Sequence, residues 1–193
     1  MPYWLTINLS RATRLRKRIT QQSPAELEDL AFEVTVKDTN SRQLDSNIDH
    51  VVERKLSESA VKVFSKKDRV IKTNSEKVGE LDIAFEARNG QTYFIEIEKS
   101  NKKTIWFDYV KLLTLIQENE GSCGIIICPK NYAHKVGTWN LFKEAVAYKS
   151  HLARVFQSSS LERVYVIGYT QYAYLDDSWV KFTPETVLRI KNS

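Results

Sequence analysis

The chain has 193 residues, of which 42% are hydrophobic and 27% are charged, and it carries a net charge of +5 at pH 7. This length suits one substantial hydrophobic core better than two, and the apolar content excludes general disorder. No stretch approaches the run of about 18 apolar residues that spans a membrane, and the N-terminus lacks the features of a secretion signal. We therefore expect one cytoplasmic domain over residues 1–193, with no membrane partner.

The sequence up to about residue 66 predicts two helices. Ser23-Pro24-Ala25-Glu26 is typical of a helix start, with Ser as the N-cap and Pro at the first helical position. From about residue 45 to residue 66, apolar residues recur at helical spacing and predict a long amphipathic helix. These residues are Ile48, Val52, Leu56, Ala60 and Val63. Glu53 lies near the edge of the buried face of this helix.

The following residues alternate between strand and helix patterns. The expected elements are a short strand at 70–71, a β-hairpin at 79–99, a helix at 104–118 that ends near Gly121, a buried strand at 125–128, a helix at 139–156 and a buried strand at 164–167. An antiparallel hairpin that leads into a parallel crossover predicts an α/β fold with a central mixed sheet flanked by helices. Residues 169–193 form a tail of short strands and a final helical turn.

The hairpin, GELDIAFEARNGQTYFIEIEK, is the most informative segment of the chain. Arg88-Asn89-Gly90 suits a three-residue loop with Gly in the left-handed position, which makes Ala87 face Gln91. Counting outward, Asp82 faces Glu96 and Glu80 faces Glu98. Strand alternation then puts an apolar set on the opposite face: Leu81, Ile83, Phe85, Tyr93, Ile95 and Ile97.

The acidic face of this hairpin predicts a divalent-metal site. Like charges directly opposite one another repel, and no Lys or Arg alternates with these carboxylates. Mg²⁺ prefers carboxylate oxygens and water, so Asp82, Glu96 and Glu80 are candidate ligands, and Mn²⁺ is a possible substitute. The alternative is the ordinary solvated face of an antiparallel sheet, where Glu is common.

The order of elements, together with Asp82 and the triplet Glu96-Ile97-Glu98, resembles the PD-(D/E)XK nuclease superfamily over roughly residues 45–168. This resemblance implies a restriction-endonuclease-like core in which Asp82 and Glu96 hold Mg²⁺. Two features depart from the usual pattern: no Pro precedes Asp82, and Glu98 stands where Lys is usual. A Glu-x-Glu triplet is similar to that of restriction enzymes of the BamHI and BglII type. Lys99 is expected to point away from the metal face.

The resemblance implies a type II restriction endonuclease, a Mg²⁺-dependent endodeoxyribonuclease that hydrolyses DNA phosphodiester bonds. Glu98 would accept a proton from the attacking water or orient it. Glu53 is a candidate for a further catalytic carboxylate from the long helix, and the alternative is a solvated residue at the helix edge. Double-stranded DNA is the expected partner, and cutting both strands of a palindrome suits a homodimer. The candidate phosphate contacts are Lys102, Lys103, Lys130 and Lys135.

Three other readings remain open. A structure-selective nuclease of repair or recombination would use the same carboxylates and recognise branched DNA. A catalytically inactive relic, disabled by the change at Glu98, would bind duplex DNA without cutting it. A structural domain with a solvated acidic sheet would bind neither Mg²⁺ nor DNA.

Overall fold

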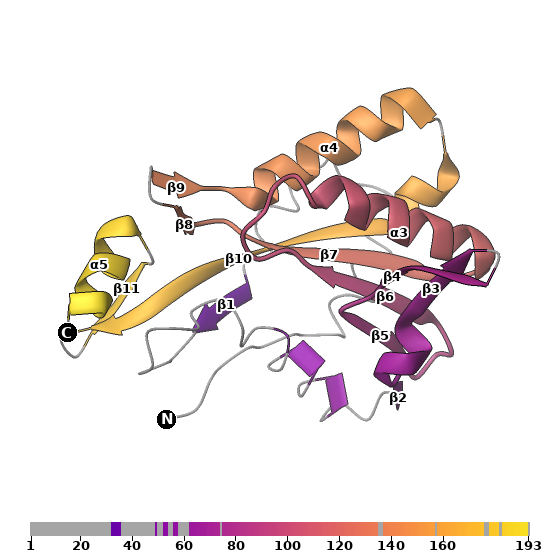
Figure 1. Cartoon of the computed structure of the whole chain (residues 1–193), viewed down its shortest axis with the longest axis horizontal. Coiled ribbons are helices and arrows are strands. Elements are labelled where there is room, and N and C mark those ends of the chain that lie inside the picture. The colour runs from indigo at the N-terminus through magenta and orange to yellow at the C-terminus, as the bar shows by residue number, and fades with distance from the viewer. Residues whose placement is uncertain are drawn as a thin grey trace.

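The computed structural model shows an α/β chain whose central mixed sheet is flanked by helices, as the sequence predicted (Figure 1). It describes residues 32–35, 49, 52–53, 56–57, 62–73, 75–134, 137–156, 158–175, 178–181 and 183–192. The helix predicted to begin at Ser23 lies outside these residues, and a single domain over residues 1–193 stays a prediction. Among the described residues, no helix has the length and apolar character needed to cross a membrane.

Runs of two to four strands are separated by helices through most of the described chain. In order, the elements are β1 (Phe32–Thr35), β2 (Lys62–Val63), the 3₁₀ helix η2 (Lys66–Arg69), β3 (Val70–Thr73), β4 (Glu76–Glu80), β5 (Ile83–Glu86), β6 (Thr92–Ile97), α3 (Ile105–Glu118), β7 (Cys123–Pro129), β8 (Tyr132–His134), β9 (Gly137–Trp139), α4 (Leu141–Phe156), the 3₁₀ helix η3 (Ser159–Arg163), β10 (Val164–Leu175), β11 (Ser178–Lys181) and α5 (Pro184–Asn192).

The main sheet of the described residues has seven strands, in the order β1-β10-β7-β6-β5-β2, with β11 paired to β10. The pairs β1–β10, β10–β7 and β7–β6 are parallel, whereas β6–β5, β5–β2 and β10–β11 are antiparallel. The predicted arrangement, an antiparallel hairpin that leads into a parallel crossover, is therefore confirmed. The hairpins β3–β4 and β8–β9 are separate from this sheet.

Helices α3 and α4 cover one face of the sheet (Figure 1). Helix α3 follows β6, and α4 follows the β8–β9 hairpin; each helix buries an apolar stripe against the strands. The cluster on this face includes Tyr109, Leu112, Leu141 and Phe142 from the helices and Ala84, Phe94, Ile126, Cys128, Val164 and Val166 from the strands. Alternate strand residues face the other way and pack with Val52 and Leu56 in a second cluster. The central strands are thus buried on both faces, as expected for parallel strands.

The hairpin loop and its register agree with the prediction. The Ala87 amide donates to the Gln91 carbonyl at 2.9 Å, Glu86 pairs with Thr92, and Gly90 has a φ of 78°. A left-handed φ at this position is costly for residues with a Cβ, so glycine suits the loop. The turn chemistry therefore determines which residues of β5 and β6 face each other.

The predicted first strand of the hairpin is wrong at its beginning, because the chain breaks into β4 and β5 at Leu81–Asp82. Glu80 pairs with Val70 on β3 rather than with Glu98, and the Leu81 amide donates to the Arg69 carbonyl. Leu81 consequently packs with the α3 side of the sheet and not with the opposite cluster of Ile83. Strand alternation does not continue through a break in the strand.

Two predicted helices have different bounds in the structure. The described helical positions of the first lie at 49–57, and Lys62–Val63 is strand β2, paired with Phe85 and Glu86. Val63 has suitable spacing for either element, and pairing with β5 decides for the strand. The helix predicted from Trp139 begins at Leu141, because Trp139 pairs with Tyr132 in the β8–β9 hairpin.

Gly168 on β10 allows α4 to approach the sheet closely. A Cβ at this position would lie 2.7 Å from Cγ of Phe142 and 2.8 Å from Cε of Lys130. We expect Gly168→Ala to lower the free energy of unfolding by about 1–3 kcal/mol, measured by urea denaturation, because a packed ring must shift. Gly90→Ala is the control, since nothing lies within 4 Å and only the positive φ is strained. An equal or smaller cost at Gly168 would contradict this packing argument.

Candidate active site

Glu96 is a carboxylate on the helix-covered face of the sheet. It lies on β6, two residues after Phe94, so both side chains face α3. Glu96 is 3% exposed, and its Oε1 atom accepts no hydrogen bond of ordinary geometry from any described residue. Glu98 is 9% exposed. The solvated acidic face, one of the readings left open by the sequence, is therefore wrong for these two residues.

Helix α3 supplies a cation and a second acid to Glu96. Lys111 Nζ lies 2.6 Å from Glu96 Oε1 and 3.3 Å from Oδ1 of Asp108, which is one helical turn earlier. Asp108 is 6% exposed, and Lys111 is only partly accessible. The ammonium therefore bridges two buried carboxylates, one from the sheet and one from the helix.

Burial alters the proton affinity of these acids. It raises the pKa of Glu96 to about 8, an effect that Lys111 opposes and that the charges of Asp82 and Asp108 reinforce. Burial likewise raises the pKa of Asp108 to about 6, and the negative charge of Glu98 contributes to the rise. The site thus holds more carboxylates than its single bridging lysine neutralises, which is a common property of functional sites.

Asp82 lies at the break between β4 and β5, next to β6. Its Oδ2 atom accepts the backbone N–H of Ile97 at 2.7 Å, and the residue is exposed. Because its charge raises the pKa of both Glu96 and Asp108, it belongs to the same electrostatic cluster. The two acids predicted to face each other across the hairpin are therefore neighbours, one exposed and one buried.

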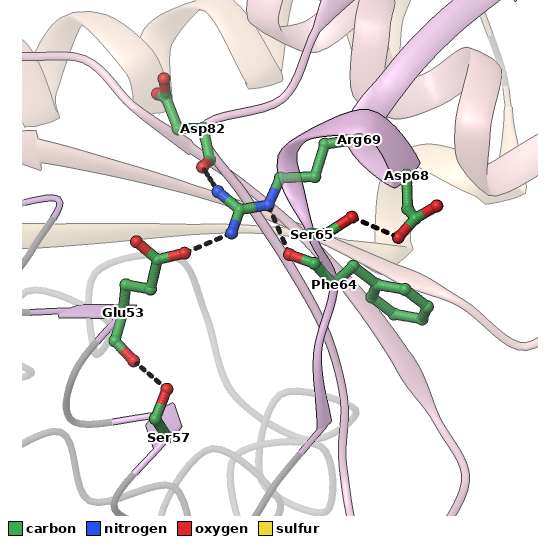
Figure 2. Close-up of polar contacts among 7 residues, drawn as sticks. All are labelled: Glu53, Ser57, Phe64, Ser65, Asp68, Arg69 and Asp82. Carbon is green, nitrogen blue, oxygen red and sulfur yellow. Dashed lines mark hydrogen bonds and ion pairs between the residues drawn. The ribbon is translucent and has the colours of Figure 1, made fainter.

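Arg69 holds the backbone of Asp82 in place (Figure 2). Its Nη1 donates to the Asp82 carbonyl at 2.5 Å and its Nε to the Phe64 carbonyl at 2.8 Å, while Nη2 donates to Glu53 Oε1. The Arg69 side chain is 5% exposed, and each of its three nitrogens donates to one of these acceptors. Figure 2 shows the Asp82 carboxylate pointing away from the guanidinium, so Arg69 positions the residue and leaves its acid group available.

Glu53 lies across the Arg69 guanidinium from Asp82 (Figure 2), and its carboxylate is the ion-pair partner of Arg69. The structure thus connects this predicted catalytic residue to Asp82 through Arg69. Lys99 pairs with Asp49 at 2.5 Å, in the same N-terminal segment as Glu53. This ion pair is separate from the one formed by Lys111, so the expectation that Lys99 avoids the metal face is met.

Glu98 organises the turn that leads into α3. Its Oε1 accepts the backbone N–H groups of Ser100 and Asn101, at 3.0 and 2.8 Å, and its Oε2 accepts the Thr104 hydroxyl. Both carboxylate oxygens therefore have donors within the chain. These contacts give Glu98 a structural role that the sequence did not indicate. Its catalytic role stays a prediction.

The remaining predicted site residues lie further out. Glu80 is exposed and pairs with Lys77 at 2.9 Å. Lys102 and Lys103 are exposed in the turn before α3, where Lys102 Nζ lies 3.7 Å from Glu144 Oε1. The ammonium of Lys130 lies over the Phe142 ring, and Lys135 is outside the described residues. The structure thus groups Asp82 with Glu96. The contacts of Glu80 with Lys77 and of Lys130 with Phe142 involve neither of these two acids.

The sequence analysis missed Asp108, Lys111 and Arg69. A signal for Asp108 was present, because it interrupts the apolar stripe Ile105, Tyr109, Leu112 and Ile116 on α3. An acid on the buried stripe of a helix needs a partner, and Lys111 lies three residues later on the same side. Arg69 gives no such signal, since it is one of several basic residues in a charged segment.

The donor chemistry of the site fits Mg²⁺. Among the described residues, no three His, Cys, Asp or Glu side chains are arranged to enclose a metal ion by themselves. Mg²⁺ is commonly held by one or two carboxylates, with waters and substrate phosphates completing the shell. Asp82 and Glu96 supply hard oxygen donors on neighbouring segments, and the ion pair with Lys111 shows that Glu96 already attracts a cation.

Comparison of the chain with protein-family models, with curated proteins and with solved structures finds no match.

Arg69→Met should destabilise the protein by about 3 kcal/mol, because it leaves two backbone carbonyls and the Glu53 carboxylate without their donor. Glu53→Gln is the matched control. Its amide oxygen still accepts from Arg69, and Glu53 is 34% exposed, so a loss of about 1 kcal/mol or less is expected. Urea denaturation measures both. Equal losses would show that the ion pair with Glu53, and not the hydrogen bonds from Arg69 to the two backbone carbonyls, supplies the stability.

Glu96→Gln should flatten the dependence of stability on pH. Between the ordinary pKa of 4.5 and the folded value of about 8, the folded state holds a proton that the unfolded chain has lost. Stability therefore falls as pH rises through this window, by up to about 1.4 kcal/mol per pH unit from this one group. Denaturation curves collected across the window should show that slope in the wild type and a reduced one in the variant. Parallel pH profiles would contradict the assignment.

Proposed function

We propose that this chain is a Mg²⁺-dependent endodeoxyribonuclease with a restriction-endonuclease-like core of the PD-(D/E)XK type. The observation that carries the proposal is the pairing of exposed Asp82 with buried Glu96 at one end of the β5–β6 hairpin, beside a cation from the crossover helix. A helix crossover from β6 to the parallel strand β7 follows the acidic triplet, which is the context that the resemblance requires.

Asp82 and Glu96 would hold the metal ion, with Asp108 as a further carboxylate close to Glu96. Bound Mg²⁺ would polarise the phosphoryl oxygen, activate water and stabilise the leaving oxygen. Asp82 is suited to a ligand role because its backbone is fixed by Arg69 and its side chain by the Ile97 amide. Fixed ligands lower the reorganisation that binding would otherwise require.

Glu98 can serve the reaction in two ways. As predicted, it would accept a proton from water, but its oxygens would then have to leave the amides of Ser100 and Asn101 or the Thr104 hydroxyl. Its contacts support a positioning role, in which it fixes the turn that carries Lys102 and Lys103. Those lysines and the backbone donors at the start of α3 would contact DNA phosphates.

The proposed substrate is double-stranded DNA, and the proposed assembly is a homodimer, which suits cleavage of both strands at a palindrome. The pI of about 9.1 supports a polyanionic partner. The contacts of Glu98 favour one second candidate, a catalytically inactive DNA-binding relic, because both of its oxygens are engaged within the chain.

Purified protein should convert supercoiled plasmid to nicked or linear forms in Mg²⁺ or Mn²⁺ and not in EDTA. Asp82→Asn and Glu96→Gln should each lower the rate by about 100-fold or more, because each removes an anionic oxygen from the metal site. Glu86→Gln is the matched control: it alters a β5 carboxylate that pairs with the Thr92 position, outside the cluster, and should change the rate little. Gel electrophoresis of the plasmid measures the rate.

The pattern of products separates the candidates. Discrete linear fragments would support a sequence-specific nuclease, and cutting confined to branched DNA would replace this assignment with the structure-selective one. Salt-sensitive duplex binding without cleavage in any divalent metal would favour the relic. Protein that neither binds nor cuts DNA would overturn the proposal.

A further inference from the structure

Lys111 contacts a buried oxygen of Glu96, which is a candidate metal ligand. Its Nζ lies 2.6 Å from Oε1, the same atom that is buried and accepts no hydrogen bond of ordinary geometry from a described residue. It also lies 3.3 Å from Asp108 Oδ1. An ammonium in this place satisfies two buried carboxylates that would otherwise be costly to keep without a cation.

We infer that Lys111 holds the cation position in the metal-free protein, and that a divalent ion binds by displacing its ammonium from Glu96. The inference rests on the metal site of the proposed function. An ammonium and a divalent cation repel one another strongly at a few ångströms in a partly buried site, so both cannot stay on one carboxylate oxygen. Binding of the metal is therefore an exchange of one cation for another.

The Lys111 side chain is in contact with solvent as well as with the site. Its side chain is 22% exposed, and its stem passes the backbone of Gly79 on β4, where a Cβ would lie only 3.3 Å from Cδ of the lysine. Gly79 has no side chain to obstruct the stem, and a lysine stem has several rotatable bonds. The freed ammonium would lie at the rim of the site, where it would meet the phosphate that arrives with the metal.

Lys111→Met tests the exchange in the full chain. We expect Mn²⁺, measured by isothermal titration calorimetry at a pH above 8, to bind this variant at least about fivefold more tightly, because no ammonium opposes it. Without metal, the variant should unfold at a lower temperature than the wild type, and saturating Mn²⁺ should raise its unfolding temperature more. Lys143→Met, which removes an exposed lysine from α4, is the matched control and should change neither quantity.

Lys111→Arg keeps a cation in place and tests the opposite direction. A guanidinium can bridge Glu96 and Asp108 through two donors, so Mn²⁺ should bind about threefold or more weakly than to the wild type. If Lys111→Met does not fold, the Mn²⁺ affinity of Lys111→Arg tests the cation exchange by itself. Unchanged or weaker Mn²⁺ affinity in a folded Lys111→Met variant, or unchanged affinity in Lys111→Arg, would overturn the inference.

The metal measurements also separate this inference from the nuclease proposal. Tighter Mn²⁺ binding by Lys111→Met, without plasmid cleavage by the wild type, would support the cation exchange and count against the nuclease. Cleavage that requires Asp82, with Mn²⁺ affinity unaffected by either Lys111 variant, would leave the nuclease standing and remove the exchange. Absence of Mn²⁺ binding in all variants would overturn the cation exchange, and plasmid cleavage would then decide the nuclease proposal, because substrate phosphates can complete the metal shell.

Discussion

The burial of the Glu96 carboxylate beneath α3 is the constraint from which the rest of the candidate site follows. A charged oxygen removed from water needs a cation or a proton, and the fold supplies Lys111 while raising the pKa of Glu96 to about 8. The buried Glu96 carboxylate is therefore stabilised only by a cation or by a bound proton. The crossover helix that covers Glu96 also brings Asp108, and in the proposed function a divalent cation would bind Glu96.

A second constraint is the break in the chain between β4 and β5. A continuous strand would have aligned Glu80 with Glu98 and left all the acids on one open face. Instead, Arg69 holds the carbonyl of Asp82 in the interior, while the carboxylate of that residue stays exposed. The two principal acids thus differ in their surroundings, and burial raises the pKa of Glu96.

Glu98 connects the candidate site to the turn that leads into α3. By accepting backbone amides at the start of the turn and the hydroxyl of Thr104, it fixes the segment that presents Lys102 and Lys103 before α3. Lys102 and Lys103 are exposed in this turn, whereas Glu96 and Glu98 are buried. In the proposed reaction, phosphate contacts from these lysines would position the DNA without neutralising the carboxylates.

The sequence by itself determined what depends on neighbours along the chain. The loop Arg88–Gly90 set the register of β5 and β6, and apolar periodicity located α3 and β7, because turn geometry and periodicity are local properties. The tertiary structure alone decided that the strand breaks at Leu81, that Arg69 binds the Asp82 carbonyl, and that Lys111 meets Glu96. Burial and long-range ion pairs depend on how helices pack against the sheet, and spacing along the chain does not encode that packing directly.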